Sequence, residues 1–262
     1  MEQAHWTDLL FLRHPEAFLA VHEAAWEKGE EQTQDLRRLL ERFGVAPGAR
    51  VLDAPCGVGR HATRLAAMGF RVVGVDLSPA FIERAKNLAR QSASGDRATY
   101  LVGDLRLLSD AVASHAPFDV ALNLWTSLGY YGEEGDARIL REYAKLVRPG
   151  GLLVLFIVNR DYVVRHFEPQ SFEAYGDFVV ISQARLDLGA SWMRNEWRFF
   201  RRGGEDLVHV VTVPVEHRIY SLHELLRLLE RSGWHVAGTF GGWKMDPPAA
   251  DAQALTIVAR RE

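Results

Sequence analysis

The chain reads VLDAPCGVGRHA from Val51 to Ala62, an apolar strand followed by a glycine-containing turn and the start of a helix. Glycine has no Cβ, so the backbone of such a turn can approach a ligand closely. In a doubly wound α/β sheet this turn lies at the carboxyl ends of the strands, where ligands bind. Gly57 and Gly59 are therefore candidate binding residues, together with Asp53 at the end of the strand.

Helical segments lead into this turn, and beyond it strands alternate with helices. The predicted strands of this part are residues 50–52, 71–75, 99–102, 119–124 and 152–158. The last of them is apolar throughout, as expected of a central strand that is covered on both faces. The alternation predicts a doubly wound, Rossmann-like parallel sheet with right-handed crossovers.

The rhythm changes after residue 159. Three further strands are predicted at residues 179–186, 192–201 and 207–218. Gly203-Gly204 between the last two is typical of a two-residue hairpin, so we interpret this part as an antiparallel β insertion. A capping box at Ser221 and Glu224 then predicts a helix. The final two strands are predicted at residues 234–239 and 255–259.

Acidic residues follow the second and third strands. Asp76 stands 19 residues beyond Gly57, where a carboxylate can accept hydrogen bonds from both hydroxyls of a ribose. Asp104 ends the third strand, where a carboxylate can accept the amino group of an adenine. The glycine turn and Asp76 also match a dinucleotide fingerprint, but Asp53 would repel a pyrophosphate and tolerate a cation. These acids suit an adenosine that bears a zwitterionic, sulfonium-containing chain.

The segment 50–159 resembles the core of the class I S-adenosylmethionine-dependent methyltransferases. The resemblance rests on the glycine turn, Asp76, Asp104 and the Pro149-Gly150-Gly151 break before the fifth strand. It implies S-adenosylmethionine as cofactor and S-adenosylhomocysteine as product. It also implies a seven-stranded sheet of order 3-2-1-4-5-7-6 with strand seven antiparallel. Pro55 departs from the family pattern, which often has a glycine at this position.

The resemblance also implies which residues bind the cofactor. From the methionine end to the adenine these are Asp53, Gly57, Gly59, Asp76, Leu77, Gly103, Asp104 and Leu105. Asn123 and Trp125 lie where the fourth strand ends, beside the expected position of the transferable methyl group.

The segments 123–131 and 159–162 resemble a bacterial subgroup with a small β insertion after the fifth strand, which includes small-molecule and sugar N-methyltransferases. We therefore expect a small-molecule acceptor that is methylated on nitrogen or oxygen. The candidate substrate residues are Tyr130, Tyr131, Arg160, His217 and Tyr220. The sequence assigns no catalytic base, and no His, Cys or Asp cluster has the spacing of a metal site.

Four parts of the chain are predicted from these segments. They are N-terminal helices at 1–48, a cofactor-binding core at 49–160, the β insertion at 161–217, and the C-terminal part of the core at 218–262. We expect the first and third parts to form a lid that excludes water and selects the substrate.

Composition argues against several other classes of protein. The net charge of -3 gives no general attraction to nucleic acid or to an anionic membrane. Cys56 is the single cysteine and no secretory signal is recognisable, which predicts a cytoplasmic protein. The longest apolar run, residues 152–158, is too short to span a bilayer. A nucleic-acid methyltransferase, a nicotinamide-dependent oxidoreductase and a binding protein without activity stay open as alternatives, as does the oligomeric state.

Overall fold

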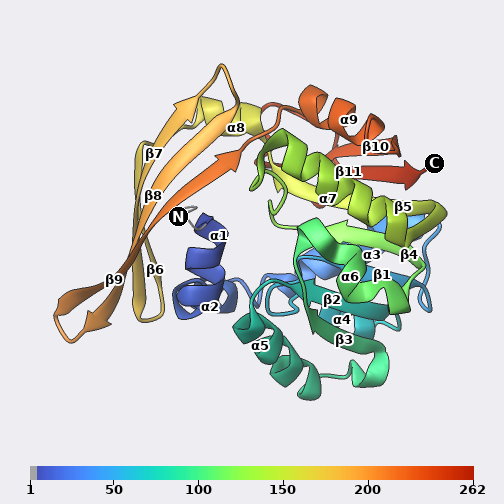
Figure 1. The fold of residues 1–262 in the computed structure, drawn as a ribbon, viewed down its shortest axis with the longest axis horizontal. Coiled ribbons are helices and arrows are strands. Elements are labelled where there is room, and N and C mark those ends of the chain that lie inside the picture. Colours follow the sequence, from blue (N-terminus) through green and yellow to red (C-terminus); the bar gives the residue numbers. More distant parts are fainter. Residues whose placement is uncertain (1–4) are drawn as a thin grey trace.

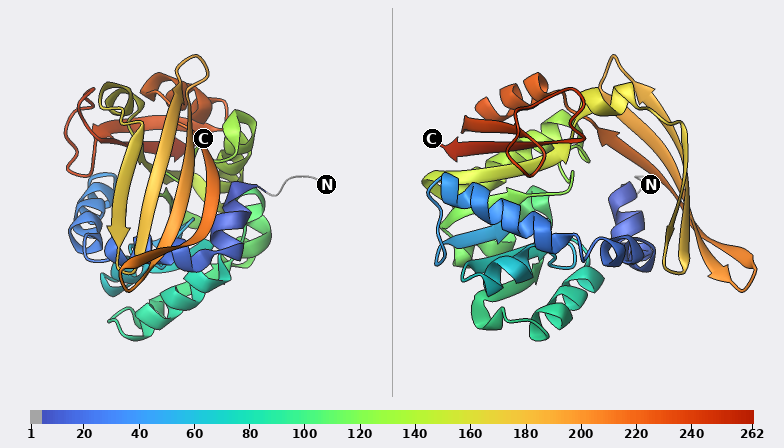
Figure 2. Two further views of the ribbon diagram at one scale, coloured as in Figure 1. Left: turned by 90° about the vertical axis from the view of Figure 1, so that its left-hand side faces the viewer. Right: turned by 180° about the vertical axis from the view of Figure 1, so that it is seen from behind.

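The computed structural model describes residues 5–262, which form a seven-stranded and a four-stranded β-sheet (Figure 1). Residues 1–4 of the predicted N-terminal part lie outside the described residues. The two sheets stand apart in the ribbon, and the first helices of the chain lie between them (Figure 1 and the right view of Figure 2). The fold therefore has a core and an outlying sheet that are joined through the N-terminal segment.

The seven-stranded sheet has the order β10-β11-β5-β4-β1-β2-β3. Its parallel strands are β1 (Arg50–Asp53), β2 (Arg71–Asp76), β3 (Ala98–Val102), β4 (Phe118–Asn123) and β5 (Val147–Val158). The antiparallel strands are β10 (Trp234–Gly241) and β11 (Ala254–Arg261). The predicted order 3-2-1-4-5-7-6 with an antiparallel seventh strand is confirmed, with β11 as strand seven.

Helices cover both faces of this sheet. On one face lie α3 (Gly29–Arg42), α4 (Ala62–Ala67) and α5 (Pro79–Arg90). On the other lie α6 (Leu108–Val112), α7 (Gly132–Leu146) and α9 (Leu222–Glu230). Leu40 of α3 and Leu140 of α7 are fully buried in the two cores. Burial of each such side chain stabilises the fold by about 1.5–3 kcal/mol. The two cores pack on opposite faces of the sheet.

Local sequence signals explain where several helices begin. Ser78 accepts a hydrogen bond from the backbone of Phe81 and so caps α5, whose first residue is Pro79. The predicted capping box of Ser221 and Glu224 is present at α9. Three 3₁₀ turns complete the connections of the core, at η2 (Gly95–Arg97), η3 (Leu105–Leu107) and η4 (Ala113–His115).

The four-stranded sheet is antiparallel throughout. Its strands are β6 (Gln170–Tyr175), β7 (Phe178–Asp187), β8 (Trp192–Gly203) and β9 (Asp206–Arg218), preceded by α8 (Arg160–Arg165). We predicted three of the four strands. The hairpin loop lies one residue later than predicted, at Gly204 and Glu205, because Gly203 still pairs with Asp206.

The N-terminal segment packs against one face of this second sheet. It consists of α1 (Trp6–Asp8), the π-helical turn η1 (Leu9–Arg13) and α2 (Pro15–Ala24). Trp6 and Leu10 are buried against Phe199 and Val213 of the sheet. The indole Nε1 of Trp6 also donates to the backbone oxygen of Glu216, at 3.0 Å. These contacts hold the sheet over the N-terminal helices.

No helix within residues 5–262 is both long and apolar enough to cross a lipid bilayer.

Candidate active site

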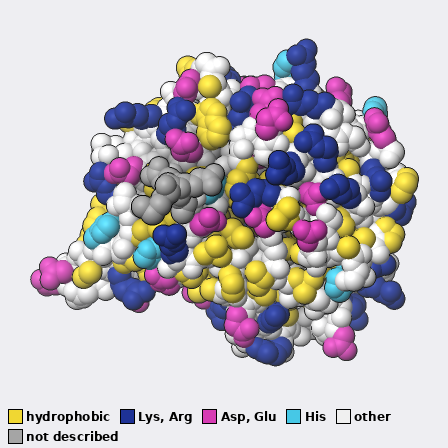
Figure 3. Space-filling view, viewed as in Figure 1, with side chains coloured by type: hydrophobic (Ala, Val, Ile, Leu, Met, Phe, Trp, Pro, Cys, Tyr) yellow, Lys and Arg dark blue, Asp and Glu magenta, His cyan; other side chains and the backbone are white. Residues whose placement is uncertain are grey.

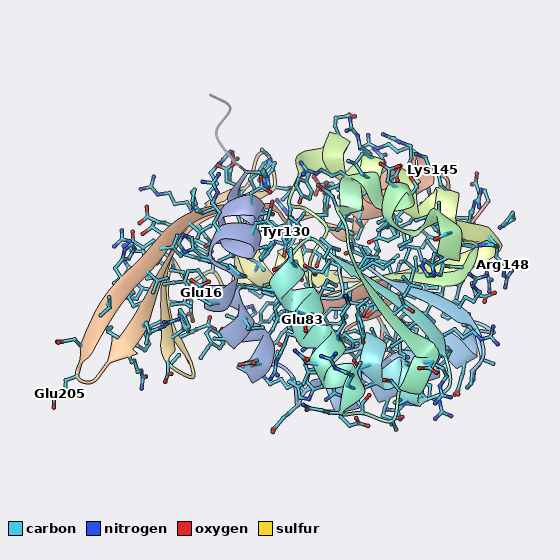
Figure 4. The ribbon with its side chains drawn as sticks, turned by 60° about the horizontal axis from the view of Figure 1, so that its bottom comes forward. Glu16, Glu83, Tyr130, Lys145, Arg148 and Glu205 are labelled. Atoms are coloured by element: carbon cyan, nitrogen blue, oxygen red, sulfur yellow. The ribbon has the colours of Figure 1, made fainter. Side chains whose placement is uncertain are left out.

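A cavity of about 340 Å³ opens at the carboxyl ends of β1, β2 and β4. Its walls come from the glycine turn of the core, from the N-terminal segment and from β8 and β9 of the second sheet. Tyr130 lies between the N-terminal helices and the core, whereas Glu205 is at the distant tip of the β8–β9 hairpin (Figure 4). The cavity is therefore enclosed by the core, the N-terminal segment and the second sheet.

The glycine turn has a conformation that other residues adopt only with strain. Gly57 and Gly59 have φ angles of +54° and +76°. A Cβ on Gly57 would lie 2.6 Å from Cε1 of His22, which covers the turn from α2. A Cβ on Gly59 would lie 2.8 Å from the hydroxyl of Tyr100. Gly57 lines the cavity, and Gly59 instead allows close packing beneath it.

Asp53 and Asp76 are buried carboxylates on the cavity floor. Burial raises the pKa of Asp53 to about 7 even though Arg60 lowers it in part. Burial likewise raises the pKa of Asp76 to about 6. The two oxygens of Asp76 accept hydrogen bonds from the backbone N–H groups of Gly57 at 2.8 Å and of Ser78 at 3.0 Å. Each oxygen keeps a lone pair for a ligand.

Arg60 brings a cation to the same region. Its guanidinium lies 4.9 Å from the ring centroid of Trp125 and donates to the backbone oxygen of Ala25. Burial lowers the pKa of Arg60 to about 10, so the group is charged at neutral pH. Asp53 also accepts a hydrogen bond from the backbone N–H of Ala62 and thereby caps α4. Asp53 thus has a structural role in addition to its place in the cavity.

Asp104 is the third carboxylate of the cavity. It accepts hydrogen bonds from the backbone N–H of Arg106 at 2.8 Å and from its guanidinium Nε at 3.0 Å. Burial alone would raise the pKa of Asp104, but the hydrogen bonds from Arg106 lower it below its usual value. Leu77 and Leu105 lie beside Asp76 and Asp104 in the wall.

Trp125, Tyr130, Tyr131 and His217 line the part of the cavity beneath the second sheet. Nε2 of His217 lies 3.1 Å from the backbone oxygen of Leu128, and because a carbonyl can only accept, this nitrogen carries the proton. Burial lowers the pKa of His217 to about 4, so the ring is neutral at pH 7. Nδ1 is therefore a hydrogen-bond acceptor.

Besides Gly59, four residues from the predicted set lie outside the cavity wall and have other contacts. Asn123 donates to the hydroxyl of Tyr143 at 3.0 Å, on the α7 side of the sheet. Arg160 donates to the backbone oxygen of Leu188. The hydroxyl of Tyr220 donates to Asp136 at 2.6 Å. Gly103 is a packing position, where a Cβ would lie 2.8 Å from that of Ala111.

Several wall residues were not predicted from the sequence. They come from the N-terminal segment, the glycine turn, α5 and β8, and they include Trp6, Phe11, Phe18, His22, Arg60, Phe81, Met193, Asn195 and Trp197. The β8 residues alternate along their strand, and Asn195 pairs with Val215 of β9, so they share the inner face with His217. The sequence shows that side chains alternate along β8, but it does not show which face of the strand lies toward the core.

A second cavity, of about 330 Å³, lies between α8 and the inner face of β7 and β8. Met193 and Asn195 belong to the walls of both cavities. Within residues 5–262 no group of three or more His, Cys, Asp or Glu side chains is arranged to hold a metal ion.

Comparisons with known proteins point to one kind of enzyme. A family model described as a methyltransferase domain matches residues 51–151. A methyltransferase of Streptomyces halstedii is 32% identical over 73% of this chain, and the alignment spans 64% of that relative's length. A glycine/sarcosine N-methyltransferase of Halorhodospira halochloris is 26% identical over 90% of this chain and 84% of its own length. A tRNA 5-carboxymethoxyuridine methyltransferase of Escherichia coli is 32% identical over 51% of this chain and 49% of its own length.

Solved structures share the fold. That of an amino pentose methyltransferase from Micromonospora echinaspora, with S-adenosylmethionine bound, superposes with a TM-score of 0.66. The superposition covers 92% of this chain and 96% of the other at 19% sequence identity. At this identity the likeness concerns the fold, including the second sheet, since so much of each chain is covered.

Proposed function

We propose that this chain is a class I S-adenosylmethionine-dependent methyltransferase and that it methylates a small molecule in the cavity beneath the second sheet. The observation that carries this proposal is the enclosure of the cavity, whose floor is the glycine turn and whose roof is formed by α1, α2, β8 and β9. An acceptor must fit between floor and roof, which favours a small molecule over a polymer.

The residues of the floor fit the cofactor. S-adenosylmethionine, when bound, supplies a methyl group that its sulfonium charge already activates. We propose that Asp76 receives the ribose hydroxyls on its two remaining lone pairs and that Leu77, Asp104 and Leu105 surround the adenine. The methionine end would lie at Asp53 and Gly57, with the guanidinium of Arg60 near its carboxylate.

The charge distribution supports a small acceptor over a nucleic acid. Arg60 is the one Lys or Arg side chain in the wall within residues 5–262, whereas nucleic-acid sites are lined with basic groups. On the face shown in Figure 3 basic and acidic side chains are interspersed, without a continuous basic surface. The tRNA-modifying relative aligns with only half of this chain, so it says little about the roof.

Positioning is the main catalytic contribution that these residues offer. In-line transfer needs the acceptor atom held opposite the departing sulfur, and fixing that geometry removes much of the entropic barrier. The Nδ1 acceptor of His217 can receive a hydrogen bond from the N–H or O–H group of the methyl acceptor. We therefore propose that Tyr130, Tyr131 and His217 orient the acceptor.

Ligand-induced thermal stabilisation tests the cofactor part of the proposal. S-adenosylhomocysteine at 100 times its Kd should stabilise the protein by about 2.7 kcal/mol, which raises the midpoint by roughly 5–10 °C. Asp76→Asn should lose most of this shift. A midpoint raised by NAD or NADP instead would contradict the proposal.

Methyl transfer itself tests the acceptor class. The protein is incubated with labelled S-adenosylmethionine and either a panel of small amines and phenols or total tRNA. We expect label in small products only, and label in tRNA would overturn the small-molecule proposal.

A further inference from the structure

Aromatic rings form much of the wall under the second sheet. They belong to Trp6, Phe11, Phe18, Trp125, Tyr130 and Trp197, and we call this set the aromatic wall. The rings contact one another in series. Ring centroids are 4.7 Å apart for Trp6 and Tyr130, 5.4 Å for Phe11 and Phe18, and 6.1 Å for Phe18 and Trp197. The N-terminal segment, the loop after β4 and strand β8 thus build one continuous surface.

The charged groups of the cavity are mostly acidic. Asp53, Asp76 and Asp104 line the cavity with the guanidinium of Arg60, which already lies over Trp125 and donates to the backbone of Ala25. The guanidinium of Arg106 pairs with Asp104 from outside the cavity wall. His22 adds no positive charge, because burial lowers its pKa to about 3. Within residues 5–262 the cavity wall therefore holds one cationic side chain, Arg60, and that side chain already has partners.

Two polar groups interrupt the aromatic wall on the roof. The amide of Asn195 and the unprotonated Nδ1 of His217 both lie on the inner face of the β8–β9 pair. Asn195 is nearly buried, and no hydrogen bond is formed by its side chain among residues 5–262. Both groups can accept hydrogen bonds from an N–H donor.

Resting on the proposed function, we infer that the methyl acceptor is an amine on an apolar body, bound in cationic form against the aromatic wall. The face of an aromatic ring attracts a cation through its quadrupole, and a desolvated cavity strengthens that attraction. A neutral molecule of the same shape receives the apolar contacts but not this attraction.

The chemistry of transfer is compatible with this binding mode. A bound ammonium group first loses a proton to solvent and so regains its lone pair. The nitrogen then forms a bond to the methyl carbon, the carbon–sulfur bond breaks, and its electron pair stays on sulfur. The product is again an ammonium ion, now methylated, and S-adenosylhomocysteine is neutral at sulfur. The aromatic wall thus faces a cation before and after transfer.

A matched pair of probes tests the inference. Titration calorimetry at pH 7 on protein saturated with S-adenosylhomocysteine compares (4-hydroxyphenyl)trimethylammonium with 4-tert-butylphenol, its neutral isostere. The quaternary probe cannot be methylated at nitrogen, so binding alone is measured. We expect the cation to bind about tenfold or more tightly than the isostere.

Substitutions in β8 locate the effect. Trp197→Leu should remove most of the preference for the cation and leave the binding of S-adenosylhomocysteine unchanged. Trp192→Leu is the matched control, because Trp192 lies on the same strand but outside the cavity wall. Its ring is next to Gly132, where a Cβ added to the glycine would lie 3.5 Å from the indole. The control substitution should leave the affinity for both probes unchanged.

The possible outcomes distinguish the amine acceptor from the methyltransferase function on which it rests. Equal affinity for the two probes, tighter binding of the neutral one, or binding of neither would overturn the amine acceptor even if S-adenosylhomocysteine binds normally. Failure to bind S-adenosylhomocysteine would instead overturn the proposed function. The wild-type comparison decides the inference even if Trp197→Leu does not fold, and Phe18→Leu provides a second variant in the same wall.

Discussion

A single buried carboxylate at the end of β1 links the fold to the chemistry at the scale of one residue. Asp53 caps α4 through the backbone of Ala62 and at the same time faces the cavity. Its burial disfavours the ionised form, which a cationic ligand would in turn stabilise. We propose that the ligand-free protein holds this side chain at a cost in stability, which the bound cofactor would remove.

The stability of the ligand-free protein should reflect that cost. Burial raises the pKa of Asp53 from 3.8 to about 7, so between these values the folded protein binds a proton that the unfolded chain has lost. The contribution of Asp53 is thus less favourable at pH 8 than at pH 5. Asp53→Asn should gain stability relative to wild type by on the order of 2 kcal/mol over this interval. Urea unfolding at both pH values measures the difference, and a pH-independent difference would contradict the raised pKa.

Tyr220 provides a second prediction at this scale. Its hydroxyl donates to Asp136, which also accepts from the backbone of Gly129, so the group joins the end of β9 to α7. Tyr220→Phe leaves a buried carboxylate oxygen without that partner and should cost about 1–3 kcal/mol of unfolding free energy. The affinity for S-adenosylhomocysteine, measured by calorimetry, should stay unchanged. A large loss of affinity for S-adenosylhomocysteine without loss of stability would instead show that Tyr220 contributes to the binding site.

At the scale of elements, the N-terminal segment and the second sheet depend on each other. Phe199 of β8 is fully buried between them, together with Trp6 and Val213. The seven-stranded sheet has its own two cores and does not need this contact. Loosening the contact should therefore open the roof of the cavity and leave its floor in place.

Phe199→Ala tests this dependence. The lost contacts and the remaining void should cost about 3–5 kcal/mol within this part of the molecule. Limited trypsin digestion should then cleave faster at Arg13 and within residues 178–218, which contain six arginines, but not at Arg50 of β1 or Arg71 of β2. Equal acceleration in all regions would show that the molecule unfolds as one unit.

Strands and helices were predictable from sequence where the signal is local. Most strands of the core begin and end within two residues of the predicted positions, because apolar runs mark them. β5 is the exception, since it begins at Val147 and so includes the Pro149-Gly150-Gly151 segment that was predicted to precede it. β6 escaped prediction because none of its side chains is buried, so no run of core-facing apolar residues marks it in the sequence. Asp136 lies in the second turn of α7 and points inward, where it accepts hydrogen bonds from Gly129 and Tyr220.

At the scale of the whole molecule, one cavity is lined by residues of the core, the N-terminal segment and the second sheet. The positions of Asp53, Gly57 and Asp76 followed from the order of the strands, which the resemblance supplied. The positions of Trp6, Phe18 and Trp197 depend on how the N-terminal segment meets a sheet nearly two hundred residues later. No local pattern carries that information, since it depends on long-range packing.

Cofactor binding should accordingly protect distant segments together. Because floor and roof line the same cavity, S-adenosylhomocysteine should slow hydrogen exchange in the glycine turn and also in α2 and β8. Mass spectrometry of peptides from these segments measures the effect, with Asp76→Asn as the control that lacks it. Protection confined to the turn would show that the roof closes only on the acceptor.

The contact of Trp6 with the backbone of Glu216 spans 210 positions of the chain. At a synthesis rate of roughly 5–20 residues per second, the N-terminal segment leaves the ribosome about 10–40 s before its partner strand is made. During that interval Trp6, Leu10 and Phe18 have no sheet to cover them. The nascent chain thus exposes an apolar, aggregation-prone segment while its core is being translated. A chaperone that binds such segments would raise the yield of folded protein.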